Sequence, residues 1–313
     1  RKVGRRRRPS PPATSGDVGL TIRTIVAAIA LENGDEPVAR RAIQLTAAHG
    51  ASLVLVHAIE SLPASDPDLP SPAKEEAITK VLAAEATASL QHLAEGAVVQ
   101  TELSVECGRA DQIIDRLIRD HAADLLIIGP GKPQNLRERV FGSTADRVVR
   151  NCACPILVVK REAVHPYRRI AAAIDFSPMS FTAAQIAARI APLAAFELIH
   201  ALEIPLTFEQ AMLKVGTTQA EIDQYLKAKA RTAHAELRSL RSNLSVPGKI
   251  RVVRGDPATA LVRLARSGRT DLLALGVQGR NAISELVLGS IARRVLASSS
   301  CDVLVAKESV SFV

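Results

Sequence analysis

The chain has 313 residues, enough for about two domains of ordinary size. Hydrophobic residues make up 47% and charged residues 23% of the sequence, which is typical of globular proteins and excludes disorder over most of the chain. No apolar run approaches the roughly 18 residues that a membrane-spanning helix requires, so no membrane segment is expected.

Most of the net charge of +8 lies in the segment 1–19. Six Lys and Arg fall between Arg1 and Arg8, and Asp17 is the one acid of the segment, so it carries +5. This stretch is rich in Pro, Ser and Gly, and we expect a disordered basic tail. A polyanion-binding arm or a targeting signal is the alternative. No apolar segment of the kind found in secretory signals follows the arginines, so the cytoplasm is the expected location.

The segments predicted after the tail alternate between strand and helix. The first half is expected to contain strands at 22–29, 51–58, 98–105, 124–128 and 156–160, and helices at 37–49, 73–95, 111–121 and 143–151. The second half is expected to contain strands at 169–174, 196–201, 250–253, 271–275 and 303–306, and helices at 179–191, 219–243, 258–266 and 290–298. Short apolar strands alternating with amphipathic helices predict an α/β fold with parallel sheets covered by helices on both faces.

The two halves are copies of one unit. Four landmarks recur at the same offset of 147 positions: Asp124 and Asp271, Gly129 and Gly276, Gly142 and Gly289, and Cys154 and Cys301. An offset held across strand, loop and helix indicates duplication of a whole domain. We therefore predict domain 1 at residues 20–161 and domain 2 at residues 168–307.

Domain 2 carries a glycine pattern suited to phosphate. Gly276 ends an apolar strand, Gly279 follows in the loop, and Gly289-Ser290 opens a helix, giving G-x2-G-x9-G-S. Glycines let the backbone approach a ligand closely, and a helix N-terminus favours an anion. Glycines needed only for tight turns are the alternative explanation.

These residues resemble the universal stress protein family, and the resemblance covers about residues 20–307. It implies two tandem flavodoxin-like domains, of the adenine nucleotide α-hydrolase type, each a five-stranded parallel sheet in the order 3-2-1-4-5. It also implies ATP as cofactor, with or without Mg²⁺. The residues of domain 2 that match the family's nucleotide site are Ala173, Ile174, Asp175, Ala201, Gly276, Gly279, Arg280, Gly289, Ser290 and Ile291. Asp175 would contact the nucleotide, Ala173, Ile174 and Ala201 would lie on the adenine side, and Gly276, Gly279, Gly289 and Ser290 would hold the phosphates.

Domain 1 departs from that pattern. Ala30 stands where domain 2 has Asp175, and Lys132 stands where the second glycine belongs, although Gly142-Ser143 is kept. We expect a degenerate nucleotide site that binds ATP weakly or not at all, and the alternative is that Lys132 pairs with a phosphate.

No catalytic or metal-binding set is evident. The chain has no Walker motif, and Cys152-Ala-Cys154 lacks the second pair that a four-coordinate metal site needs, so small buried cysteines are the simpler explanation. His57 and His200 recur after equivalent strands and are expected to be structural, with an acid–base role as the alternative. We expect a protein that is not an enzyme, with slow ATP hydrolysis left open.

Two functions remain from the sequence. The first is an ATP-dependent stress-response switch that is read by a protein partner. The second is a nucleotide-independent stress protein that binds an apolar ligand or protein partner, with residues 203–218 covering an apolar ligand; the same segment could instead be a lid over the nucleotide. No membrane or specific nucleic-acid partner is expected. The resemblance implies that the last strands of the two domains pair within the chain as a pseudo-dimer, and it leaves open a further homodimer.

Overall fold

The computed structural model describes residues 21–31, 36–60, 72–131, 142–244, 247–277 and 288–307, without the side chains of residues 72–75. The predicted tail and three residues of the predicted loops, Lys132, Gly279 and Arg280, lie outside the described residues. Domain 1 contains β1 (Thr24–Ala28), α1 (Glu36–His49), β2 (Ser52–Ile59), α2 (Pro72–Ala94), β3 (Thr101–Cys107), α3 (Ala110–Asp120), β4 (Leu125–Ile128), α4 (Ser143–Asn151) and β5 (Ile156–Val158). Domain 2 contains β6 (Arg169–Ala173), α5 (Pro178–Ile190), β7 (Ala195–Leu202), α6 (Leu206–Lys214), α7 (Gln219–Leu244), β8 (Gly248–Arg254), α8 (Pro257–Arg266), β9 (Leu272–Gly276), α9 (Ser290–Ser298) and β10 (Asp302–Ala306).

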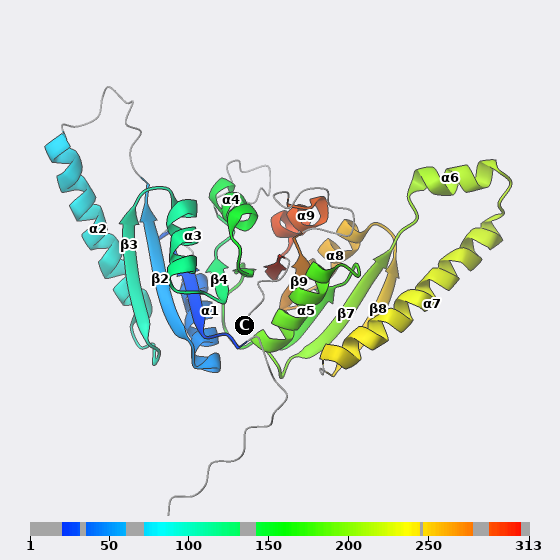
Figure 1. Cartoon of the computed structure of the whole chain (residues 1–313), viewed down its shortest axis with the longest axis horizontal. Coiled ribbons are helices and arrows are strands. Elements are labelled where there is room, and N and C mark those ends of the chain that lie inside the picture. Colours follow the sequence, from blue (N-terminus) through cyan, green and yellow to red (C-terminus); the bar gives the residue numbers. More distant parts are fainter. Residues whose placement is uncertain are drawn as a thin grey trace, which may run out of the picture.

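The described strands form one sheet in the order β3-β2-β1-β4-β5-β10-β9-β6-β7-β8. Within each domain the strands are parallel and follow the predicted order 3-2-1-4-5, which confirms the fold class. At the middle of the sheet β5 and β10 pair antiparallel, with Leu157 opposite Leu304. The two domains therefore extend a single sheet to either side of this pair (Figure 1).

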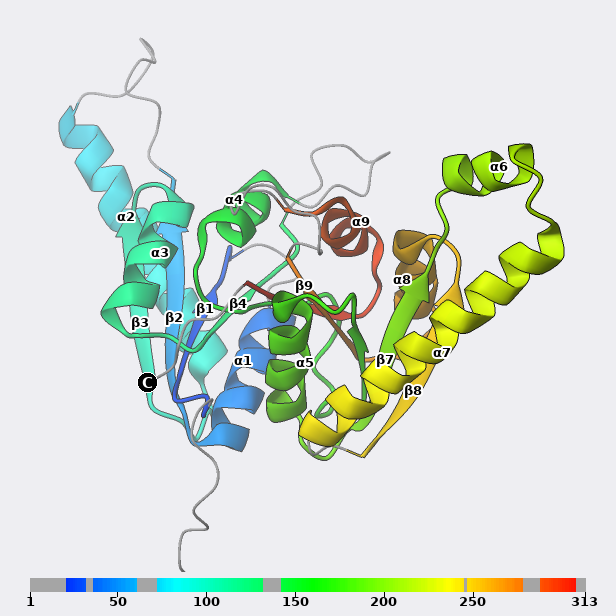
Figure 2. The same cartoon turned by 45° about the vertical axis from the view of Figure 1, so that its right-hand side comes forward.

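Helices cover both faces of the sheet (Figures 1 and 2). Successive residues of a strand contribute in turn to two apolar cores, one on each face of the sheet. Ile25 and Ala27 belong to the core under α1 and α5, whereas Val26 belongs to the core under α3 and α4. This alternation follows from the two-residue period of a strand. Because every central strand is buried on both faces, the carboxyl edge of the sheet is left as the place for a site.

Local sequence explains where the helices of domain 2 begin. Ser177 caps α5 by accepting a hydrogen bond from the Ser180 N–H at 3.2 Å, and Pro178 occupies the first turn. Asp256 caps α8 in the same way, accepting from the Thr259 N–H at 2.6 Å. Gly255, just before this cap, has φ of +113°, a value that side-chain-bearing residues rarely adopt.

The segment 203–218 differs from the expected pattern because it contains a helix, α6, that the strand-helix alternation did not include. This helix packs mainly against α7, and both project beyond the edge of the sheet (Figure 1). Of the apolar side chains that recur every three or four residues along α7, Ile222, Ala233 and Leu237 are buried, while Leu226, Ala230, Leu240 and Leu244 are half-buried.

A buried polar cluster ties the two domains together where the chain crosses between them. The Asp302 carboxylate accepts hydrogen bonds from the Tyr167 hydroxyl at 2.6 Å and from the backbone N–H groups of Lys160 at 2.8 Å and Arg161 at 3.2 Å. Arg41 of α1 lies 3.6 Å from the same carboxylate and 4.0 Å from the centre of the Tyr167 ring. Strand β5 ends at Val158, two residues earlier than predicted, because the Lys160 N–H bonds this side chain instead of a neighbouring strand.

The cysteines match their expected structural role. In the described part of the chain Cys107, Cys152, Cys154 and Cys301 are free thiols, and Cys107 is exposed. Cys154 and Cys301 are buried just before the last strand of each domain, and burial raises the pKa of the Cys301 thiol to about 12. The sulfur of Cys152 lies 3.4 Å from that of Cys154.

Candidate functional site

The predicted site residues of domain 2 that the structure describes lie at one edge of the sheet. Strand β6 ends at Ala173, which is paired with Ile199 of β7, and β9 ends at Gly276. Because these strands are parallel, their carboxyl ends meet at the same edge. Asp175 lies two residues after the end of β6, and Ala201 is the second-last residue of β7, so both belong to this edge.

The Asp175 carboxylate is oriented by the start of α5. Its Oδ1 accepts hydrogen bonds from the Ser177 backbone N–H at 3.0 Å and from the Ser177 hydroxyl at 2.6 Å. Phe176, between them, has φ of +65°, a conformation that is uncommon for a large side chain and that turns the chain sharply out of the strand. The carboxylate is thereby held, partly exposed, at the carboxyl edge of the sheet.

His200 supports the same turn from β7. Its Nδ1 lies 2.8 Å from the Ile174 carbonyl oxygen, and its ring packs against Phe176 with the centroids 4.7 Å apart. The side chain of Ile174 is buried in the core, so only its backbone faces the edge. His57 makes the matching 2.8 Å contact with the Ile29 carbonyl in domain 1, which agrees with the structural role expected for both histidines.

The two ends of the predicted phosphate loop are joined by backbone hydrogen bonds. The Gly289 N–H donates to the Val277 carbonyl at 2.9 Å, and the Val277 N–H donates to the Ala306 carbonyl at 2.9 Å. Helix α9 begins directly after Gly289, which has no side chain to cap it, and Ser290 and Ile291 are exposed. The first N–H groups of α9 have no acceptor within the helix, which makes this terminus suited to an anion.

Comparison with known proteins identifies the chain. The model of the universal stress protein family matches it twice, at residues 21–160 and 166–307. The chain belongs to the universal stress protein family. Its two matches make it a tandem member, as the sequence predicted, and place it among stress-response proteins.

Individual relatives agree with this assignment. The chain is 26% identical over 148 residues to universal stress protein MJ0531 of Methanocaldococcus jannaschii, covering 47% of this chain and 86% of the relative. It is 29% identical over 193 residues to universal stress protein Rv2005c of Mycobacterium tuberculosis, covering 60% of this chain and 63% of the relative. A solved universal stress protein from Archaeoglobus fulgidus shares the fold, with a TM-score of 0.66, 16% identity and coverage of 93% of this chain and 100% of that one.

In this universal stress protein the edge of domain 1 repeats the backbone of the site without its carboxylate. Leu31 has φ of +57°, like Phe176, and the Gly142 N–H donates to the Pro130 carbonyl at 3.1 Å, which joins the ends of the loop. Ala30 stands at the position of Asp175. Gly131 has φ of +73°, and a Cβ there would lie 3.0 Å from the Cα of Gly142.

Sequence reasoning missed Ser177 and Phe176, which set the position of the Asp175 carboxylate. A signal was present, because a Ser before a Pro at the start of an amphipathic helix is a typical N-cap. None of the helices in the described ranges combines the length and apolar character needed to cross a membrane.

Proposed function

We propose that domain 2 binds ATP and that the nucleotide acts as a regulatory ligand whose presence is sensed by a protein partner during stress. The observation that carries this proposal is that Asp175 and the start of α9 share the carboxyl edge in domain 2, whereas domain 1 keeps the same turn with Ala30 in place of the carboxylate. The proposal assigns no catalytic residue.

The residues of the site fit a nucleotide. The exposed Ser290 hydroxyl and the first N–H groups of α9 offer donors to phosphate, and Gly276 and Gly289 leave room for it. Ala173 is partly exposed and apolar, as expected beside an adenine, with Ala201 and the backbone of Ile174 nearby along the same edge. Gly279, Arg280 and Ile291 are assigned to the nucleotide from their places in the motif, and Mg²⁺ would accompany the phosphates.

A calorimetric titration of ATP with Mg²⁺ into nucleotide-free protein tests the proposal. We expect one site per chain, and loss of binding in a double variant carrying Asp175→Ala and Gly279→Lys, which copies the two departures of domain 1. Ser290→Ala should weaken ATP binding about tenfold, since a hydrogen bond to a charged group is worth about 1.5 kcal/mol. The matched control is Ser143→Ala at the equivalent position of domain 1, which should bind as the wild type does. No binding to the nucleotide-free wild type would contradict the proposal.

The exposed apolar side chains of α6 favour a second candidate, a nucleotide-independent protein that binds an apolar ligand or partner. Leu206 is 67% exposed, Phe208 53% and Val215, just after the helix, 82%. Such side chains gathered on a projecting element are typical of a binding surface. If ATP fails to bind while an apolar fluorescent probe binds and is lost in Phe208→Gln, this second function replaces the first.

A further inference from the structure

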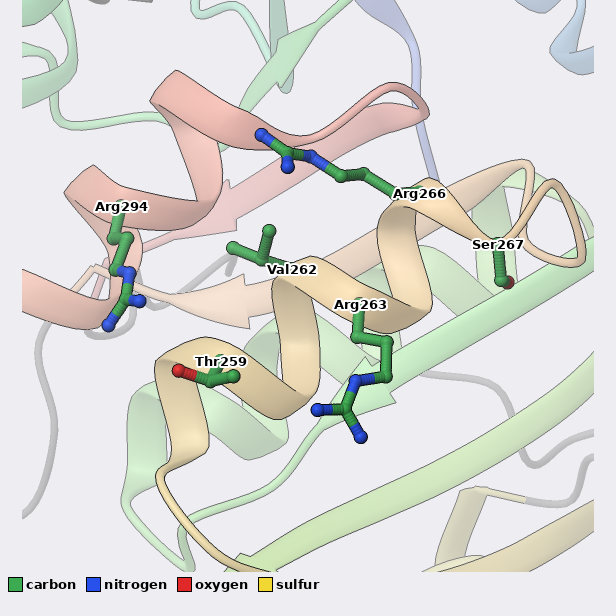
Figure 3. A pocket seen from close by; sticks show the side chains of 6 residues that line it. All are labelled: Thr259, Val262, Arg263, Arg266, Ser267 and Arg294. Atoms are coloured by element: carbon green, nitrogen blue, oxygen red, sulfur yellow. The ribbon is translucent and has the colours of Figure 1, made fainter.

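The outer surface formed by α8 and α9 contains a hollow with a cluster of arginines. Its volume is about 480 Å³, and it is lined by Thr259, Val262, Arg263, Arg266, Ser267 and Arg294. Arg294 points from α9 toward the Thr259 end of α8, and Arg266 reaches from the other end of α8 toward α9 (Figure 3). These side chains lie on the helices, not among the residues assigned to the carboxyl edge.

The equivalent surface of domain 1 also has arginines, but there each arginine has a carboxylate partner. Arg116 contacts Glu106 and lies 3.3 Å from Asp120, and Arg119 lies 2.5 Å from Asp115. The Arg116 guanidinium also lowers the pKa of the Glu106 carboxyl, as expected for an ion pair. This surface of domain 1 is therefore neutralised by its own side chains.

Domain 2 keeps the arginines and lacks those partners. At the offset of 147, Arg263 and Arg266 correspond to Arg116 and Arg119. The carboxylates Glu106, Asp111, Asp115, Asp120 and Asp146 are replaced by Val253, Ala258, Val262, Ser267 and Arg293. This surface of domain 1 has ten charged positions, of which five are arginines and five are carboxylates. The equivalent positions of domain 2 hold four arginines and one carboxylate.

That single carboxylate belongs to Asp256, which caps the N-terminus of α8. It accepts the Thr259 N–H and lies 3.4 Å from Arg294; the hydrogen bonds from Thr259 lower the pKa of this carboxyl. Arg266 donates to the Ser298 carbonyl at 2.8 Å, which leaves further donors on its guanidinium. Within the described residues Arg263 makes no ion pair or hydrogen bond. The lining of the hollow thus holds three arginines and no acid, and Asp256, just outside the lining, pairs with Arg294.

We propose that the α8–α9 hollow of domain 2 binds a small phosphate-bearing anion. Guanidinium groups match the oxygens of phosphate in two-pronged contacts. A phosphate accepts hydrogen bonds from all sides, which suits donors supplied by two helices. The lining contains no aromatic side chain on which a base could stack, so a single-stranded nucleic acid is the poorer fit.

Restoring the carboxylates of domain 1 tests this proposal. A double variant with Val262→Asp and Ser267→Asp should form i,i+4 ion pairs with Arg266 and Arg263, as Asp115 and Asp120 do with their arginines in domain 1. The probe is inorganic tripolyphosphate, titrated calorimetrically into the full chain. We expect its affinity to fall at least tenfold in this variant and to be unchanged in Arg238→Gln, which removes an exposed charge on α7.

Binding elsewhere on the chain gives a different result. Tripolyphosphate held only at the carboxyl edge, where the proposed nucleotide site would also take phosphates, would titrate equally into the wild type and the Val262→Asp, Ser267→Asp variant, and that outcome would overturn the proposal, as would no binding to the wild type. Citrate, a carboxylate trianion, should bind at least tenfold more weakly than tripolyphosphate, and equal binding would reject the assignment to phosphate. In domain 1, Asp115→Val with Asp120→Ser is expected to create a second, weaker site.

Discussion

Domains 1 and 2 have the same backbone but use equivalent positions differently. Leu31 and Phe176 share an unusual positive φ, and Gly142 and Gly289 begin matching helices. By contrast, domain 1 has Ala30 at the position equivalent to Asp175 and Pro155 at the position equivalent to Asp302. Duplication therefore preserved the turns on which the fold depends, while side chains at the edge, the outer surface and the junction diverged.

The largest effect on stability is expected at Asp302 in the junction between the domains, where domain 1 has Pro155 at the equivalent position. Asp302→Ala should lower the free energy of unfolding by about 3–5 kcal/mol, because the buried charge of Arg41 would lose its carboxylate partner and the Tyr167 hydroxyl would lose its acceptor. Urea denaturation of the full chain measures this. Asp302→Asn keeps an acceptor oxygen and should cost less; two variants that both unfold like the wild type would show that the cluster does not stabilise the junction.

An intermediate effect is expected where the domains are most alike. Asp124 accepts the N–H groups of Arg23 and Thr24, and Asp271 accepts those of Arg168 and Arg169. Asp124→Ala should lower the free energy of unfolding by about 1–3 kcal/mol, because it leaves strand-start donors without an acceptor.

Asp271→Ala should cost more than its counterpart, since this carboxylate also lies 2.8 Å from the Arg169 guanidinium. Urea denaturation of the two single variants side by side makes the comparison. Equal losses would mean that the added ion pair, whose arginine is half exposed, contributes nothing measurable.

The sequence predicted most of this architecture because the apolar period within each element and the repeat offset between the domains can both be read directly from the order of residues. Helices α4 and α9 begin and end where expected, and Ala30 marked the divergence of domain 1 directly. The sequence did not predict α6, which lies in the least repeat-like segment of the chain and whose apolar residues suggested a ligand cover. Nor could it predict the bond between Tyr167 and Asp302, because nothing local links residues 135 positions apart.

The smallest effect should come from the outer surface of domain 1, where Glu106 pairs with Arg116 and domain 2 has Val253. The hydrogen bond from Arg116 lowers the pKa of Glu106, so this pair stabilises the fold above the ordinary value of 4.5 and the stabilisation is lost as the pH falls through the lowered pKa. Glu106→Gln should reduce the melting temperature at pH 7 by less than about 2 °C, because exposed ion pairs contribute little. The difference between variant and wild type should vanish below the lowered pKa, which thermal melts across the acid range would detect. Glu85→Gln, which removes an exposed charge from α2, is the control: a similar pH-dependent difference there would mean that net charge, and not the ion pair, sets the effect.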